Sequence, residues 1–250
     1  MRLAYADRGR YLGDPGFVEV PVAGLIDPAY LAQRSRLIRA DATMAKVEAG
    51  TPPGAPARVA AVPNEVPATT NFVAADGRGD VLSWTSTVEG AFGSQLVASG
   101  FILNNELTDF SFAPRGASGS LVANRVQPGK RPMSAMSPTI VYGPDGKVLL
   151  ALGSAGGPRI IMHVMKTLVG VLDWKLPVGQ AIALPNIFLS GDTLLVEQGT
   201  ALEAMRPALE KLGHVVGTAE LVSKVNAIER TSAGWQGGAD PRSEGEALAQ

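Results

Sequence analysis

Two adjacent threonines, Thr69 and Thr70, open a strand-like segment directly after a proline-rich stretch. If the peptide bond before Thr69 is broken, that residue gains a free α-amine with a reference pKa of about 7.7–8.0. Such an amine accepts the proton of the hydroxyl on the same residue, which makes the threonine an internally activated nucleophile. Ordinary strand residues fit the dipeptide equally well, so this chemistry needs support from other features.

Three further groups supply the remaining parts of a site for acyl transfer. Gly156 and Gly157 stand where the chain turns into a helix, and N–H groups at a helix start suit an oxyanion. The alternative is a turn that needs glycine for steric reasons. Glu106 and Asp109 suit a substrate ammonium, or else form a solvated turn. Ser134 suits a substrate carboxylate, or else caps a strand.

A hairpin is the element that must position the nucleophile. Two β-rich runs flank a turn centred on Arg78, which predicts an antiparallel pair of strands. This register places Thr69 opposite Thr87 and Phe72 opposite Trp84. Directly opposed Cβ atoms lie about 4.5–5.5 Å apart, so we expect the two threonine hydroxyls to share a hydrogen bond.

The rest of the chain divides into a helical opening, a linker and further short elements. Residues 49–68 contain five prolines without periodicity, which is typical of a linker. The expected strands are 69–75, 81–88, 95–103, 139–152 with an internal turn, and 193–197, and the expected helices are 27–47, 160–174, 178–184 and 200–212.

The composition excludes several classes of protein. The chain has 250 residues, 46% of them hydrophobic, and a formal net charge of −1, so it has a core but no basic surface for nucleic acid. It contains no cysteine, which excludes disulfides and a thiol nucleophile. Two histidines alone make a histidine-based metal site hard to build. No run approaches the roughly 20 apolar residues that span a bilayer.

The remaining polar residues are expected to be structural. We expect His163, on an apolar helix, to be a core residue, and His214 to lie in a loop. We expect Glu197 and Lys211 to lie on solvated faces.

Taken together, the motifs resemble those of the γ-glutamyltransferase (γ-glutamyltranspeptidase) family of N-terminal-nucleophile hydrolases, over nearly the whole chain. Three opening motifs are similar to the end of the family's large subunit, and the others to its small subunit. The motifs are Ala4-Tyr5-Ala6-Asp7-Arg8, Tyr11-Leu12-Gly13-Asp14-Pro15, Val20-Pro21-Val22, Thr69-Thr70-Asn71-Phe72-Val73, Asn104-Asn105-Glu106, Asp109-Phe110-Ser111, Lys130-Arg131-Pro132-Met133-Ser134, Met136-Ser137-Pro138-Thr139, Gly153-Ser154-Ala155-Gly156-Gly157-Pro158-Arg159-Ile160 and Asp240-Pro241-Arg242.

The resemblance implies an α+β fold that is part of a four-layer αββα sandwich. Residues 1–68 are then the C-terminal end of the large-subunit region with its proline-rich linker, and residues 69–250 the small-subunit catalytic region. It also implies a precursor that cleaves itself between Ala68 and Thr69. The remaining large-subunit portion is then a partner of this chain, and no cofactor or metal is implied.

The resemblance further implies a γ-glutamyl hydrolase or transferase that acts on glutathione or related compounds through an acyl-enzyme, with water, an amino acid or a dipeptide as acceptor. It implies a periplasmic or secreted location, although the polar opening residues contain no signal peptide, which would leave a full-length product in the cytoplasm. The roles it implies are catalysis for Thr69 and Thr87, oxyanion binding for Gly156 and Gly157, ammonium binding for Glu106 and Asp109, and α-carboxylate binding for Ser134.

Two residues depart from the family pattern. Glu89 stands where the family usually has an asparagine that holds the glutamyl group, and Ala135 stands where it commonly has a second serine. Both changes weaken the binding of a free α-carboxylate. Two alternatives therefore stay open: an amidase of the cephalosporin (glutaryl) acylase type with the same fold, and a non-catalytic fragment that never matures.

Overall fold

A computed structural model describes residues 1–61 and 69–249. The helices are α1 (Arg2–Tyr11), α2 (Val22–Leu25), α3 (Pro28–Ser35), α4 (Ile160–Leu172), α5 (Val178–Ala183) and α6 (Arg206–Lys211), with 3-10 helices η1 (Glu106–Asp109), η2 (Gly157–Arg159) and η3 (Glu203–Met205). The strands are β1 (Thr69–Ala75), β2 (Val81–Thr87), β3 (Val97–Ala98), β4 (Phe101–Ile102), β5 (Thr139–Tyr142), β6 (Val148–Gly153), β7 (Ile187–Ser190), β8 (Thr193–Glu197), β9 (Val215–Ala219), β10 (Asn226–Thr231) and β11 (Gly234–Ala239).

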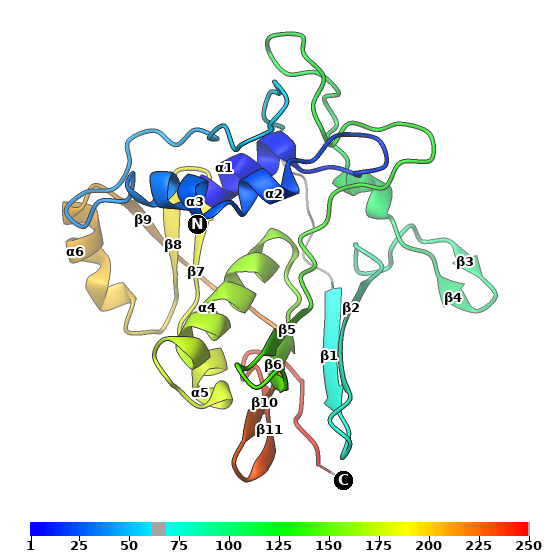
Figure 1. The fold of residues 1–250 in the computed structure, drawn as a ribbon, viewed down its shortest axis with the longest axis vertical. Coiled ribbons are helices and arrows are strands. Elements are labelled where there is room, and N and C mark those ends of the chain that lie inside the picture. Colours follow the sequence, from blue (N-terminus) through cyan, green and yellow to red (C-terminus); the bar gives the residue numbers. More distant parts are fainter. Residues whose placement is uncertain (62–68, 250) are drawn as a thin grey trace.

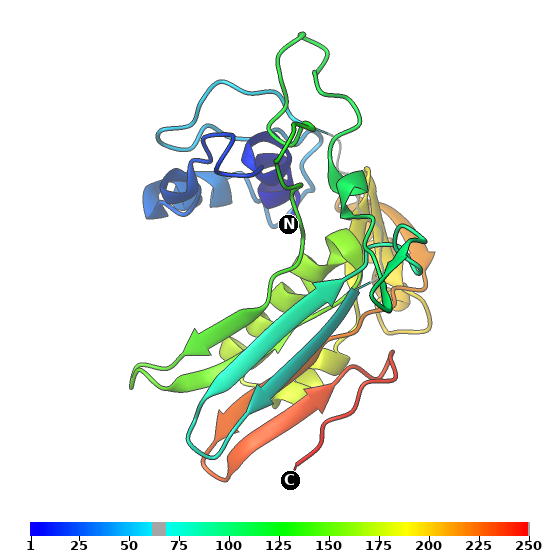
Figure 2. The ribbon, with the colours of Figure 1, turned by 90° about the vertical axis from the view of Figure 1, so that its right-hand side faces the viewer.

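A four-stranded antiparallel sheet forms the middle of the fold. Its strand order is β11-β10-β6-β5. Helices α4 and α5 pack against one face, and the β1–β2 hairpin packs against β10 and β6. Figure 2 shows the hairpin in front of this sheet and the two helices behind it. The layers are thus helix, sheet and hairpin.

Side chains join the hairpin to the sheet. The Ser83 hydroxyl donates to the Leu152 carbonyl at 2.9 Å, and the Asn226 amide donates to the Asn71 carbonyl at 2.7 Å. On the hairpin, the Phe72 and Trp84 rings stack with centroids 6.0 Å apart. The mixed α+β class is therefore confirmed: the described residues form a layer of helices, a four-stranded sheet and a two-stranded hairpin.

The apolar core lies between α4, α5 and the four-stranded sheet. Gly170 on α4 allows the close approach of α5, because a Cβ there would lie 2.7 Å from the Ala181 Cβ. Fully buried aliphatic side chains exclude water from this layer, which is the main favourable term in folding. The buried cluster consists of Leu150, Leu152, Ile160, Val164, Val171, Val178, Ala181, Ile182, Val225 and Ala227.

A second sheet and the N-terminal helices complete the fold. The second sheet has the order β7-β8-β9, with β8 and β9 parallel. Figure 1 shows α1, α2 and α3 grouped on one side of α4, away from the four-stranded sheet. Within residues 1–61 and 69–249 no helix is both long and apolar enough to cross a bilayer.

The expected helix over residues 27–47 is wrong in its extent. Asp27 caps α3 by accepting a hydrogen bond from the Tyr30 N–H at 2.8 Å, and Pro28 occupies the first turn. The helix ends at Ser35, and the Leu37 and Ile38 N–H groups bond three residues back in turns. Apolar residues spaced six and seven apart did not sustain a helical stripe beyond that point.

Other expected elements are also shorter than the sequence indicates. The expected strand 95–103 is a small hairpin of β3 and β4, because Ser99 and Gly100 have positive φ angles of 50° and 83° and turn the chain. The expected helix 200–212 is η3 followed by α6. The other expected elements, 139–152 with its turn, 160–174, 178–184 and 193–197, agree with the structure to within a few residues.

Glu197 is buried, which corrects its expected position on a solvated face. Its carboxylate forms an ion pair with the Arg242 guanidinium and accepts a hydrogen bond from the Asn186 N–H at 2.6 Å. Arg242 also pairs with the buried Asp240 at 3.1 Å. These contacts join the segment after β11 to β8 and to the end of α5, a long-range link that a residue type alone does not reveal.

Replacing Arg242 with alanine is expected to lower the free energy of unfolding by about 3 kcal/mol. The reason is that the substitution leaves the buried carboxylates of Glu197 and Asp240 without their main cation. Urea unfolding followed by circular dichroism measures this loss. The matched control is Arg206→Ala, which breaks an exposed pair with Glu210 and costs about 0.5 kcal/mol or less. Equal losses in both variants would contradict a structural role for the buried pair.

Candidate active site

Two threonine hydroxyls meet at one end of the β1–β2 hairpin. Thr69 begins β1, Thr87 ends β2, and the two are register partners, as are Phe72 and Trp84. The Thr69 hydroxyl donates to Thr87 Oγ1 at 3.3 Å. The expected register is therefore confirmed. The contact is longer than the usual O–H···O distance of about 2.7–2.8 Å.

Thr87 is itself held in place. Its Oγ1 accepts a hydrogen bond from the Glu89 N–H at 2.8 Å. This bond helps to fix the Thr87 hydroxyl next to Thr69. The bond before Thr69, at which the family resemblance implies cleavage, includes Ala68, which lies outside the described residues.

A narrow pocket beside Thr69 contains almost all of the site residues expected from the sequence. The described part of its lining includes Gly157 but leaves out Gly156, which is one residue earlier on the same turn. Residues from five separate segments thus converge on one small volume. The lining consists of Thr69, Thr87, Glu89, Glu106, Asp109, Ser134, Ala135, Met136, Gly157 and Ile160.

Three carboxylates concentrate negative charge in this pocket. One oxygen each of Glu89, Glu106 and Asp109 lies within 4.8 Å of the other two. Glu89 and Asp109 are buried. Carboxylates this close in a partly buried pocket give it a negative potential, which attracts cations. The spacing of the three oxygens is compatible with a cation between them.

Asn105 joins the two segments that carry these carboxylates. Its side-chain oxygen accepts from the Gly90 N–H at 2.7 Å, and its own N–H donates to the Val88 carbonyl at 3.1 Å. Its amide group also donates to Thr108 Oγ1 at 3.3 Å. These bonds place Glu89, between Val88 and Gly90, next to η1.

Asn124 is a positioning residue that the sequence analysis missed. It is buried in a glycine-rich and serine-rich loop, where a lone asparagine gives no distinctive signal. Its amide donates to the Asp109 carbonyl at 2.7 Å, and its side-chain oxygen accepts from the Met133 N–H at 2.9 Å. Asn124 thereby links Asp109 to the segment that carries Ser134.

Lys130 supports the same loop from within the fold. Its ammonium is buried and donates to the carbonyls of Ala123 and Arg125 at 2.6 and 3.0 Å. Burial lowers the pKa of Lys130, and the nearby guanidinium groups of Arg125 and Arg58 act in the same direction. The lysine of the Lys130-Arg131-Pro132 motif is therefore a buried loop anchor.

The segment from Ser134 to Met136 lines two neighbouring cavities. Ser134 is exposed and its hydroxyl accepts from the Met136 N–H at 3.2 Å, whereas Ala135 is buried. Ser134, Ala135 and Met136 line the pocket beside Thr69 and also a larger apolar groove with a cavity volume of about 900 Å³. The groove is thus adjacent to the pocket.

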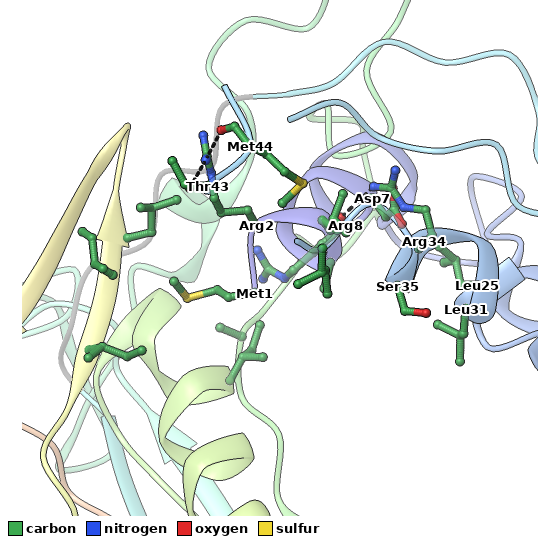
Figure 3. A pocket seen from close by; sticks show the side chains of 18 of the residues that line it. Met1, Arg2, Asp7, Arg8, Leu25, Leu31, Arg34, Ser35, Thr43 and Met44 are labelled. Atoms are coloured by element: carbon green, nitrogen blue, oxygen red, sulfur yellow. Dashed lines mark hydrogen bonds and ion pairs between the residues drawn. The ribbon is translucent and has the colours of Figure 1, made fainter. Parts of the chain in front are cut away.

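Side chains of α1 and α3 form much of the groove. Figure 3 shows Arg2 reaching the Met44 carbonyl and Thr43, and Arg34 paired with Asp7. The measured distances are 2.6 Å from Arg2 to the Met44 carbonyl and 3.0 Å from Arg34 to Asp7. These bonds hold the segment after α3 across α1.

Comparison with known proteins places this chain in a family. The model of the family described as gamma-glutamyltranspeptidase matches residues 1–250. The chain belongs to the γ-glutamyltranspeptidase family. The resemblance inferred from the motifs is therefore confirmed, and their convergence on one pocket agrees with it.

Individual relatives give the extent of the match. A glutathione hydrolase proenzyme of Bacillus subtilis is 36% identical over 261 residues, which cover 99% of this chain and 43% of that protein. An acylase ACY 1 proenzyme of Pseudomonas sp. strain SE83 is 32% identical and covers 91% of this chain and 38% of that protein. The chain thus spans less than half the length of these curated relatives.

A solved structure agrees in fold. The γ-glutamyltranspeptidase from Pseudomonas nitroreducens complexed with L-DON matches with a TM-score of 0.63 and 32% sequence identity. The match covers 72% of this chain and 99% of that chain. Over that share of its length, the chain therefore has the fold of a known family member.

His163 lies directly behind the glycine turn. It is 2% exposed, as expected for a core residue, and its Nδ1 lies 3.0 Å from Ser154 Oγ. Burial lowers the pKa of His163 to about 4. The charge of Lys166 and, more weakly, that of Arg159 act in the same direction, while Asp240 opposes them. The imidazole is therefore neutral at pH 7. His214 lies in the turn before β9, as expected.

This lowered pKa makes stability depend on pH in a predictable direction. The unfolded chain takes up a proton on His163 near its ordinary pKa of 6.5, whereas the folded chain does so near 4. The stability contribution is therefore complete above about pH 6.5 and is lost as the pH falls toward 4. Between about pH 7 and pH 4.5 this group lowers the free energy of unfolding by about 2 kcal/mol.

The variant His163→Asn, which does not titrate, is expected to lose that part of the pH dependence. Urea unfolding at the two pH values measures it for the wild type and the variant. His214→Asn, which changes the chain's other histidine, is the matched control and should keep the wild-type slope. The same slope in His163→Asn and the wild type would contradict a buried neutral imidazole.

Proposed function

We propose that this chain is the catalytic part of a self-processing γ-glutamyl hydrolase or transferase that cleaves the γ-glutamyl amide of glutathione or a related compound. The observation that carries the proposal is the Thr69–Thr87 hydroxyl pair at the edge of a pocket with three carboxylates. Family membership supports the reaction class, and two of the relatives are named as proenzymes. The remaining large-subunit portion of the precursor and a periplasmic or secreted location belong to the same proposal.

Maturation comes first in the proposed sequence. The Thr69 hydroxyl attacks the Ala68 carbonyl, and the resulting ester is opened by water, which leaves Thr69 with a free α-amine. That amine takes the hydroxyl proton when Thr69 Oγ1 attacks the γ-carbonyl of the substrate. The proton then passes to the leaving amine. Water, or the amine of an amino acid or dipeptide, attacks the acyl-enzyme and restores the threonine.

The neighbouring groups have complementary proposed roles. The N–H groups of Gly156 and Gly157, at a turn that leads through η2 into α4, stabilise the oxyanion. Glu106 and Asp109 hold the substrate ammonium, and Ser134 holds its α-carboxylate. A γ-glutamyl group carries an ammonium, which suits an acidic pocket, whereas a glutaryl group carries none. The charge of the pocket therefore favours a γ-glutamyl donor.

Thr69→Ala is expected to abolish both the chain break and turnover, because it removes the attacking oxygen. Intact-mass spectrometry of the purified protein detects the break, and release of chromophore from a γ-glutamyl anilide measures turnover. Thr70→Ala is the matched control, since Thr70 is exposed and pairs with Ser86 on the hairpin. A wild-type chain that stays uncut and inert would support the non-catalytic alternative, and turnover in Thr69→Ala would refute the nucleophile.

Glu89→Gln is expected to shift the donor preference toward a γ-glutamyl compound with a free α-carboxylate and away from its α-amide. The negative charge of Glu89 repels the free α-carboxylate of a γ-glutamyl donor but not the neutral α-amide of the same donor. Both donors keep the ammonium, so its attraction cancels in the comparison. Neutralising Glu89 should raise the ratio of kcat/KM for the acid over the amide by about fivefold, which corresponds to about 1 kcal/mol of repulsion.

The two anilides are compared in steady-state kinetics with the wild type and the variant. Glu19→Gln, a change at an exposed residue of the segment between α1 and α2, is the control for a general loss of negative charge. An unchanged or lowered ratio in Glu89→Gln would show that Glu89 does not oppose the α-carboxylate.

A further inference from the structure

A buried hydroxyl and a buried imidazole join the two ends of the glycine turn. Ser154 directly follows β6 and is 0% exposed, and His163 lies in the first turn of α4 and is 2% exposed. The distance from Ser154 Oγ to His163 Nδ1 is 3.0 Å, which is within hydrogen-bond range, and the Ser154 hydroxyl also donates to the Ala155 carbonyl at 3.1 Å. The bond between Ser154 and His163 spans the turn that contains Gly156 and Gly157.

The turn needs an external contact because its own sequence gives it little rigidity. Gly156 and Gly157 have φ angles of +134° and +57°, conformations that residues with a side chain rarely adopt. Glycine also loses more conformational entropy on ordering than any other residue. The backbone N–H groups of these two residues therefore keep one direction only if neighbouring atoms hold them there.

The His163 ring supplies such a contact at a second point. A Cβ added to Gly156 would lie 3.1 Å from His163 Cε1 and 3.6 Å from Nδ1. The ring is therefore packed against the Gly156 backbone at the same time as it bonds Ser154. His163 is not part of the described lining of the Thr69 pocket, so it contacts the turn from the core side.

We propose that His163, through its bond to Ser154 and its packing on Gly156, is a positioning residue that fixes the direction of the Gly156 and Gly157 N–H groups. This inference rests on the proposed function, in which those N–H groups stabilise the oxyanion. Preorganised donors act on charge that develops in the transition state. Loosening the turn therefore lowers kcat and leaves KM nearly unchanged.

The kinetic test uses a double-mutant cycle with a conservative rescue. Ser154→Ala and His163→Leu each remove the bond, and each is expected to lower kcat for a γ-glutamyl anilide about tenfold with KM within about twofold. The double variant is expected to be no worse than the poorer single variant, because both act through one bond. His163→Asn keeps a polar atom near the Nδ1 position and should recover most of kcat.

Thr167→Val is the matched control for loss of a buried hydroxyl on the same helix. Thr167 is 0% exposed, but its hydroxyl donates to the His163 carbonyl within α4 at 2.9 Å and not to the turn. Its kcat should equal that of the wild type. Additive losses in the cycle, or an equal loss in Thr167→Val, would refute a specific role for the Ser154–His163 bond.

A second readout does not depend on catalysis. Amide hydrogen exchange of Gly156 and Gly157, followed by NMR in the full chain labelled with ¹⁵N-glycine, should be faster in Ser154→Ala than in the wild type and unchanged in Thr167→Val. Ser154→Ala removes a single oxygen atom, so it is the variant of choice if His163→Leu does not fold. A wild type without γ-glutamyl turnover would refute the proposed function alone, whereas unchanged exchange in Ser154→Ala would refute this inference.

Discussion

The register of the β1–β2 hairpin is the constraint on which the candidate site depends. Thr69 and Thr87 meet because seven residue pairs follow one another without a bulge from the turn to the strand ends. A slip of one residue would turn one hydroxyl to the opposite face. Asn71 opposes such a slip, because its amide donates to the Trp84 carbonyl at 2.9 Å and to Thr85 Oγ1 at 3.0 Å. The register is thus fixed by side chains as well as by the turn.

Features that depend on residues close together in the sequence could be predicted, whereas features that depend on contacts between distant residues could not. The hairpin register was predictable because a short turn fixes pairing by counting residues. The burial of Glu197 was not, since its partner Arg242 lies 45 residues away. The role of Asn124 in linking Asp109 to the Ser134 segment likewise depends on tertiary contacts. The motifs indicated which residues belong together, but the asparagines that hold them together could not be found from local pattern.

The outer face of the β1–β2 hairpin exposes large apolar side chains. Phe72 and Trp84 are 49% and 52% exposed although they stack on each other, and Leu82 on the same hairpin is 43% exposed. Exposed aromatic side chains of this size are costly in water when they form a continuous patch. These three side chains form an apolar patch on the face of the hairpin that points away from the four-stranded sheet.

The backbone strain and burial of Glu89 support a functional role for the acidic pocket. Glu89 has a φ angle of +72° and is 4% exposed. Both the positive φ angle and the burial of a carboxylate lower the stability of the fold, and an exposed glutamate in an ordinary conformation causes neither loss. Such positions persist where surrounding bonds determine the backbone, and here Asn105 bonds the residues on both sides of Glu89. In return the Glu89 N–H reaches Thr87 Oγ1 and the carboxylate joins Glu106 and Asp109. One strained residue therefore couples the orientation of the threonine pair to the charge of the pocket that faces it.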